Sequence, residues 1–310
     1  MISVIIPAHQ EEGYIGDCLR HVLASDPPRA RDGTAQPVQV IVVANGCADA
    51  TAQEARSLAG RFAQRGWPME IVELAEGSKP RALNAGDRRA IYDIRVYMDA
   101  DIWVSPGLIA GLAGVLDRPE PAYAGGALQD TGCPWLVLEA LCAILVEAAL
   151  HGFGRAGLWG LCGERSGPGT VGDFPEVTAD DMFVRYHFAP EESHPVPEDY
   201  VWPIAGNFAQ LVRSRRRQDE GLAEIRRLLP EGAARSGPTA PSGGELLRLF
   251  LSDPVGFAVY ASVALAVRTP LFFQAGPLGP WPVGGGGLAP AGGSAPARLT
   301  ADSPGVFRAR

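Results

Sequence analysis

Four short apolar runs alternate with helix-like segments in the first hundred residues, and this alternation constrains the fold more than any other feature. Each run ends at a polar turn, as expected of strands in a parallel sheet that helices cover on both faces. The segments between the runs repeat apolar residues three and four positions apart, which is typical of helices packed on a sheet. The order predicts a βαβαβαβ unit with right-handed crossovers. The expected strands are 2–6, 38–43, 69–74 and 94–98, the first of them ended by Pro7, and the expected helices are 14–24, 52–64 and 79–89.

The fourth run ends abruptly in two carboxylates, Asp99 and Asp101. In open α/β sheets, ligands bind beyond the carboxyl ends of the strands. Two aspartates one residue apart on a turn can converge on one hard divalent cation, which would bridge a diphosphate. The other interpretation is a strand end followed by acids, because Ser105 and Pro106 are typical of the start of a helix. These residues alone leave both interpretations open.

Composition bounds the class of protein. The chain has 310 residues, of which 46% are hydrophobic and 20% charged, so it can bury one large domain or two small ones. Its formal net charge of −8 argues against a nucleic-acid partner. Five cysteines without a C-x-x-C spacing indicate neither a disulfide framework nor a zinc site. Because no secretory signal pattern precedes the first apolar run, we expect a cytoplasmic protein with reduced thiols.

The second half of the chain is less regular. Apolar patterns predict a strand at 122–128, a strongly apolar helix at 135–150 and a short helix at 180–188 that begins with two acids. A further helix at 207–217 ends in a group of arginines. These are Arg213, Arg215, Arg216 and Arg217.

Four segments of the chain, in this order, resemble the motifs of family 2 glycosyltransferases. They are residues 4–12 (VIIPAHQEE), 45–51 (NGCADAT), 77–86 (GSKPRALNAG) and 99–101 (DAD). The resemblance extends over about residues 2–190. It implies an α/β, Rossmann-like nucleotide-diphospho-sugar transferase (GT-A) fold with a mostly parallel central sheet, a nucleotide-diphosphate sugar donor, and a divalent metal, Mn²⁺ or Mg²⁺.

The same resemblance implies the donor-binding residues. Asn45 stands where the family commonly has an Asp that hydrogen-bonds the base, and an amide can both donate and accept. The alternative for Asn45 is a simple Asn-Gly turn. Lys79, the only lysine of the chain, or Arg81 falls where the family has a cation near the donor phosphates, at a helix N-terminus that itself attracts anions. The expected donor-binding residues are Pro7, Ala8, His9, Glu11, Asn45, Lys79, Arg81, Asn84 and Asp99.

The resemblance also implies the metal ligands and the catalytic base. Asp99 and Asp101 are the expected metal ligands. In the segment 172–185 an acidic pair follows a Gly-Phe turn, and the second acid, Asp181, maps to the family's base, with Asp180 as its neighbour. An attacking hydroxyl must lose its proton, which a carboxylate within hydrogen-bond reach can take. The alternative is a helix N-terminus on which acids favour the dipole.

We therefore predict transfer of a single sugar to a hydroxyl acceptor, with inversion. The chain lacks the Gln-x-x-Arg-Trp motif and the membrane spans of the family's processive synthases, so polymer synthesis is disfavoured. The alternatives are a retaining transferase on the same fold, a sugar nucleotidyltransferase and a non-catalytic nucleotide-sugar binder. The loops 152–172 and 189–201 are expected to form the acceptor pocket. Their sequence identifies neither the sugar nor the acceptor.

The C-terminal part is predicted to be an appendage. We divide the chain into a catalytic domain at 1–231, with a donor half at 1–104 and an acceptor half at 105–231, a linker at 232–244, an apolar helical segment at 245–273 and a disordered tail at 274–310. Residues 255–267 carry no charge, are too few to span a bilayer and could lie in its interface. With the arginines of 213–217, they favour contact with the inner face of the membrane and a lipid-linked acceptor. Packing on the domain and dimerisation are the alternatives.

Overall fold

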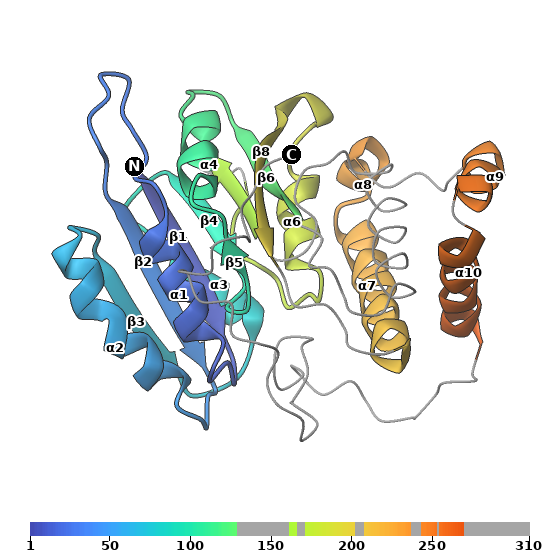
Figure 1. Cartoon of the computed structure of the whole chain (residues 1–310), viewed down its shortest axis with the longest axis horizontal. Helices are drawn as coiled ribbons and strands as arrows, with labels where there is room; N and C mark the ends of the chain where they lie inside the picture. The colour runs from blue at the N-terminus through green and yellow to red at the C-terminus, as the bar shows by residue number, and fades with distance from the viewer. Residues whose placement is uncertain (129–160, 166–170, 202–207, 237–242, 253, 270–310) are drawn as a thin grey trace.

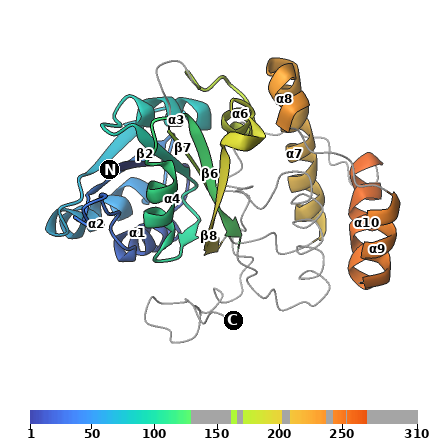
Figure 2. The ribbon, with the colours of Figure 1, turned by 90° about the horizontal axis from the view of Figure 1, so that it is seen from above.

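A computed structural model describes residues 1–128, 161–165, 171–201, 208–236, 243–252 and 254–269 (Figure 1). The strands form one mixed sheet in the order β3-β2-β1-β4-β7-β6-β8-β5. Helices cover both faces of this sheet, and two further helices, α9 and α10, lie at the end of the molecule farthest from α2 in both ribbon views (Figures 1 and 2). The chain therefore has an α/β fold with an appended helical part.

The parallel half of the sheet confirms the predicted βαβαβαβ unit. Its strands are β1 (Ile2–Ala8), β2 (Val38–Asn45), β3 (Met69–Leu74) and β4 (Ile94–Met98), and they pair with one another in parallel. Its helices are α1 (Ile15–Ala24), α2 (Thr51–Gln64) and α3 (Lys79–Asp87). The first two pack on one face of the sheet and α3 on the other, which follows from the alternation of side chains along β1. All loops that follow these strands consequently meet at one edge.

The predicted end of the first strand at Pro7 was wrong, because β1 continues to Ala8 and Pro7 pairs with Val43. Strand β4 pairs with β1 only as far as Ile5. Pro7 therefore lies where β1 has a neighbour on one side alone, and a residue without an N–H is tolerated at such a position.

The other half of the sheet is mostly antiparallel. It consists of β6 (Ala122–Leu128), as predicted, β7 (Leu161–Arg165), β8 (Ser193–Val201) and the short β5 (Trp103–Val104), followed by α4 (Leu108–Leu116). The expected loop at 189–201 was wrong, because β8 pairs with both β6 and β5. Its Pro195 pairs with Gly125, next to an irregularity in the register where a proline disturbs the ladder least. The predicted helix at 135–150, most of the loop at 152–172 and the tail at 274–310 lie outside the described residues.

The C-terminal helices are α6 (Asp180–Tyr186), α7 (Phe208–Leu228), α8 (Pro230–Ser236), α9 (Gly243–Ser252) and α10 (Pro254–Arg268), with a 3-10 turn, η1 (Pro190–Glu192), after α6. Helix α8 occupies the first residues of the segment expected to be a linker. Its Gly232 approaches α6 so closely that a Cβ there would lie 2.2 Å from the carbonyl oxygen of Tyr186. Helix α10 packs on α7, and both helices contain a buried valine, Val263 in α10 and Val212 in α7. None of the described helices combines the length and the apolar character that crossing a membrane would need.

Candidate active site

Three loops meet at the carboxyl edge of the parallel strands, and Asn45 joins them. Its side chain is fully buried. Its Nδ2 donates to the carbonyl of Ala8 at 2.8 Å, and its Oδ1 accepts from the backbone N–H of Ser78 at 2.9 Å. Both ends of the amide are thus engaged by the ends of β1 and of the loop before α3. Asn45 was expected to contact the base of the donor, and that contact stays a prediction. Its hydrogen bonds also hold the two loops together.

The loop after β1 is held against the loop after β2 by its own polar groups. His9 Nδ1 lies 2.6 Å from the carbonyl oxygen of Asn45, and the ring lies against Gly77, where a Cβ would come within 2.9 Å of it. Gln10 has a positive φ of 57°, a strained conformation for a residue that is not glycine, and its side chain accepts from Ala48 N at 2.7 Å. Such strain persists where surrounding contacts fix it, and it is common at ligand sites.

Lys79 lies at the centre of the site. It begins α3, which Ser78 caps by accepting from the backbone N–H of Arg81. The Lys79 ammonium is 2.7 Å from Oδ1 of Asp99, just beyond β4, and 3.2 Å from Oδ1 of Asp180, at the start of α6. Its side chain is only 19% exposed. Three elements that are distant in sequence therefore meet on the single lysine of the chain.

Charge at this point is predominantly negative. Burial disfavours the ammonium of Lys79, but the carboxylates of Asp180 and Asp99 outweigh it and raise the pKa of Lys79 above its usual range. Burial raises the pKa of Asp180 to about 6, against the opposing effect of Lys79. Asp181, in the same first turn of α6, is half-buried and adds to the negative charge that Lys79 senses. One cation thus faces three carboxylates.

Asp101 and Glu11 extend the acidic region on the side of α1. Both side chains are buried, at 4% and 3% exposure. Burial first, and then the charges of Asp101 and Glu11, raise the pKa of Cys18 well above its usual value, and Asp99 acts in the same direction. These carboxylates therefore lie near enough to Cys18 to disfavour its thiolate. Among the residues that the structure describes, no three His, Cys, Asp or Glu side chains converge closely enough to hold a metal by themselves.

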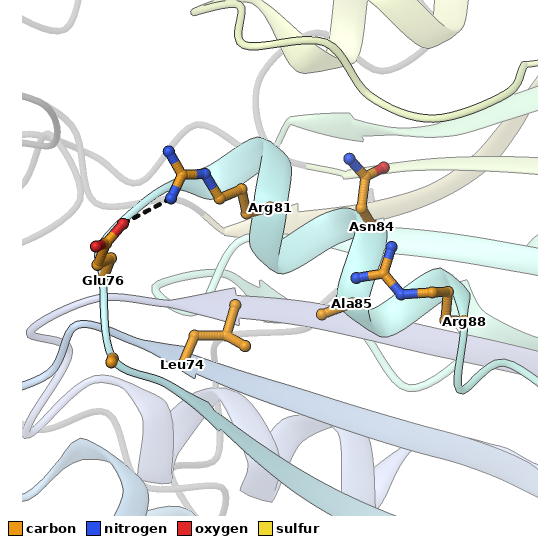
Figure 3. Close-up of a pocket in the computed structure, with 7 residues that line it drawn as sticks. Leu74, Glu76, Arg81, Asn84, Ala85 and Arg88 are labelled. Atoms are coloured by element: carbon orange, nitrogen blue, oxygen red, sulfur yellow. Dashed lines mark hydrogen bonds and ion pairs between the residues drawn. The ribbon is translucent and has the colours of Figure 1, made fainter.

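Arg81 and Asn84 bind partners outside this cluster. Figure 3 shows them on α3 beside a cavity of about 460 Å³, with Leu74 and Glu76 from the end of β3 and its loop. Arg81 is exposed and pairs with Glu76 at 2.7 Å and with Glu176 at 2.9 Å. Asn84 bonds to the backbone of Phe174. The residues expected together at the donor thus divide into two groups, Lys79 with the acids and Arg81 with Asn84 at the cavity.

Sequence reasoning missed Phe174 and Glu176 as the partners of Asn84 and Arg81 on α3. Both lie in the segment before Asp180 whose resemblance was noted only for its acids. The only signal in the sequence was their position inside that segment, since their partners on α3 are about 90 residues away.

Residues 3–137 match the sequence model of a family described as Glycosyl transferase family 2.

Among solved structures, the chain is similar to a mannosyltransferase from Pyrobaculum calidifontis in complex with GDP-Man and Mn²⁺. The two have 21% identity and a TM-score of 0.56, over 86% of this chain and 74% of that one. It is also similar to TarS of S. aureus in complex with UDP, with 13% identity and a TM-score of 0.49 over 86% and 91% of the two chains. The glucosyl-3-phosphoglycerate synthase of Mycobacterium tuberculosis in complex with Mn²⁺, UDP-glucose and glycerol 3-phosphate has 18% identity and a TM-score of 0.48 over 79% and 82%. No curated protein matches the sequence. The first likeness shows that the fold is of the GT-A type.

Proposed function

We propose that this chain, whose residues 3–137 match the sequence model of glycosyl transferase family 2, is a glycosyltransferase. It would move a single sugar from a nucleotide-diphosphate sugar to a hydroxyl group of an acceptor. The observation that carries this proposal is the meeting of Lys79, Asp99 and Asp180 at the carboxyl edge of the sheet. A cation beside several carboxylates can hold a diphosphate, a metal and a hydroxyl in one place. We assign Lys79, with the N-terminus of α3, to the donor phosphates.

We assign a divalent metal, Mn²⁺ or Mg²⁺, to Asp99 and Asp101. Their carboxylates are hard oxygen ligands, and Mg²⁺ is commonly held by one or two carboxylates together with substrate phosphates, so a third protein ligand is not required. Asp99 already accepts a cationic group, the ammonium of Lys79 at 2.7 Å, which supports the fit of a cation at this carboxylate. When bound, the metal would stabilise the negative charge that develops on the leaving diphosphate.

We assign the role of general base to Asp181. Its neighbour Asp180 is buried in an ion pair with Lys79, whereas Asp181 is more exposed. The Asp181 carboxylate would take the proton of the acceptor hydroxyl while the hydroxyl oxygen forms a bond to the anomeric carbon. The bond from that carbon to the phosphate oxygen breaks, and its electron pair leaves with the diphosphate. Attack from the face opposite the leaving group inverts the anomeric centre.

We further propose that the acceptor is presented at the inner face of a membrane, where a lipid-linked hydroxyl would be available. Support comes from apolar side chains that α9 and α10 expose, namely Leu247, Phe250, Leu251 and Leu265. Residues 208–269 also contain nine arginines against six carboxylates, whereas the whole chain carries a net charge of −8. A basic, apolar surface of this kind fits an anionic bilayer.

Thermal shift with a panel of nucleotide sugars, with and without Mn²⁺ or Mg²⁺, tests the donor and the metal together. GDP-Man, UDP-glucose and UDP-GlcNAc are the first probes, because similar structures contain them. A ligand at about 100 times its Kd adds roughly 2.7 kcal/mol to the free energy of unfolding. We expect one nucleotide class to stabilise the chain, and more strongly with metal. If no sugar nucleotide stabilises it under either condition, the proposed donor is wrong.

Turnover then distinguishes the classes of function. A transferase releases the nucleoside diphosphate when a suitable acceptor is added. A nucleotidyltransferase would instead form the sugar nucleotide from a nucleoside triphosphate and a sugar phosphate, and a non-catalytic binder would do neither. Release of the nucleoside diphosphate without any transfer to an acceptor from an acceptor library would contradict single-sugar transfer to a hydroxyl.

A further inference from the structure

The acids at the start of α6 must be held against Lys79 and Asp99, which come from a distant part of the sequence. The chain reaches α6 through residues 171–179, which contain no helix or strand. This segment turns at Gly172, whose φ of 61° suits a residue without a Cβ. It then crosses α3 before Asp180 begins α6. The contacts of this segment with α3 therefore fix the position of the acidic pair.

Asn84 makes the most specific of these contacts. Its Nδ2 donates to the carbonyl oxygen of Phe174 at 2.9 Å, and its Oδ1 accepts from the N–H of Phe174 at 2.7 Å. The amide thus pairs with one backbone residue in both directions, as a neighbouring strand would. Only a side chain that carries a donor and an acceptor on one planar group can do this.

The ring of Phe174 contacts both β4 and α6, the two elements that lead to or carry the acids of the site. The side chain is only 4% exposed. Its ring lies edge-on to Tyr97 of β4 with 5.1 Å between centroids, and 5.5 Å from Phe183 of α6. Strand β4 leads to Asp99 and α6 begins with Asp180. Aromatic pairs of this geometry stabilise the packing of the elements that carry them, so a displacement of Phe174 would move the two elements relative to each other.

The other hydrogen bonds and ion pairs that the described residues of this segment make with α3 and its cap are exposed. Glu176 pairs with Arg81 at 2.9 Å, and the two side chains are 62% and 57% exposed. Ser78 Oγ donates to the same carboxylate at 3.1 Å. Exposed ion pairs contribute little to stability, because water and salt screen them. The half-buried Asn84 pair is therefore the main polar attachment, beside the apolar packing of Val171 and Phe174 on α3.

We infer that Asn84 is a positioning residue that holds Phe174 and thereby sets Asp180 and Asp181 against Lys79 and Asp99. This inference rests on the proposed function for the role of Asp181, and it replaces the contact with the donor that the motif implies for Asn84. Asn84 acts on the reaction through the placement of the acids, without touching the sugar nucleotide.

Two substitutions of Asn84 and one control test this role. Asn84→Ala removes both hydrogen bonds. Asn84→Asp keeps the size and the bond from Phe174 N–H but turns a carboxylate oxygen toward the Phe174 carbonyl, where two acceptors repel. Glu176→Gln weakens the exposed ion pair of the same segment and leaves the Asn84 pair intact. The measurements are donor Kd, kcat for release of the nucleoside diphosphate, and hydrogen exchange of the Phe174 amide.

For both Asn84 variants we expect donor Kd within about twofold of the wild type and kcat lower by about tenfold or more. For Asn84→Ala, which loses the acceptor of the Phe174 N–H, we also expect exchange of the Phe174 amide faster by about tenfold. Glu176→Gln should stay within about twofold of the wild type in all three. Weaker donor binding with unchanged kcat would instead place Asn84 at the donor and overturn the inference. Unchanged exchange at Phe174 in Asn84→Ala would overturn it equally. If the wild type turns over no sugar nucleotide, the proposed function fails, and the exchange measurement still decides whether Asn84 holds Phe174.

Discussion

At the scale of single residues, Asp101 provides the most direct test of the metal assignment. Asp101→Asn replaces a buried carboxylate with an amide of the same size, which removes negative charge from the cation site. Loss of a ligand should weaken metal-dependent nucleotide binding by more than about tenfold, since even residues that only orient metal ligands cost that much. Calorimetric titration with and without Mn²⁺ measures the effect. Asp93→Asn, an exposed acid before β4, is the matched control. Unchanged metal dependence in Asp101→Asn would remove Asp101 from the site.

The assignment of the base to Asp181 makes a separate prediction. Asp181→Asn should preserve the fold and the donor affinity but lower kcat by about 10² to 10⁴, the usual contribution of a positioned general base. Glu191→Gln, an exposed acid in the 3-10 turn after α6, should leave kcat unchanged. Steady-state kinetics combined with donor titration checks both variants. Near-normal turnover in Asp181→Asn would move the role to another group.

The sequence predicted which residues belong to the site better than it predicted where their side chains point. The motifs indicated Lys79, Asp99 and Asp180, and the structure brings them together. The same motifs placed Arg81 with Lys79, although residues two apart on a helix do not share a face. Helical geometry alone could have separated them. That Asn84 pairs with the backbone of Phe174 could not be predicted, because a hydrogen bond between residues 90 positions apart leaves no local pattern.

At the scale of elements, local patterns predicted the parallel half of the sheet and failed for part of the other half. Strands β3 and β4 have the predicted bounds, since each is rich in apolar residues and is interrupted only by Glu70 and Glu73 in β3 and by Arg95 in β4. Strand β8 contains Pro195 and Pro197 among acids, which locally indicates a loop. Its extended form depends on pairing with β6 and β5, far away in the sequence. Long-range pairing of this kind overrides local preference.

Arg216 of α7 hydrogen-bonds the C-terminal end of α10, so its removal should affect the attachment of this helix. The guanidinium of Arg216 donates to the carbonyls of Ala266 and Thr269 at 2.7 and 2.8 Å, at the C-terminal end of α10 where a cation is favourable. Arg216→Ala should therefore release the end of α10 and speed its amide exchange by about tenfold. Arg213→Ala, an exposed arginine of the same helix, is the control. Equal exchange in the two variants would show that apolar packing alone holds α10.

The same contacts change the basis of the membrane proposal. Arg213, Arg215, Arg216 and Arg217 were expected to contact anionic lipid as a group. Arg216 instead binds carbonyls of α10, and Arg215 pairs with Asp219 at 3.1 Å. Val263, one of the side chains expected in the bilayer interface, is buried against α7. The surface available to a membrane therefore shifts from the uncharged run of α10 toward α9.

At the scale of the whole molecule, α9 and α10 form an apolar end, and the segment 208–269 that contains them has nine arginines against six carboxylates in a chain with a net charge of −8. Leu247 and Leu251 lie one turn apart on α9 and are 57% and 70% exposed. Monomers rarely expose contiguous apolar surfaces without a partner, and an anionic bilayer complements both the leucines and the surplus of arginines. We expect the intact chain to float with vesicles that contain anionic lipid, less with neutral vesicles, and less at high salt.

The combined substitution Leu247→Glu and Leu251→Glu should abolish flotation, because it places two carboxylates on the face that would enter the headgroup region. Ile91→Glu is the control, since Ile91 is 65% exposed but lies next to the parallel sheet, far from α9. The control should float like the wild type, and kcat on a soluble donor should be the same in all three proteins. If the double variant floats as well as the wild type, α9 does not bind the membrane. If the wild type does not float but sediments as a dimer that the double variant loses, the same leucines join two copies of the chain, and the acceptor need not be attached to a lipid.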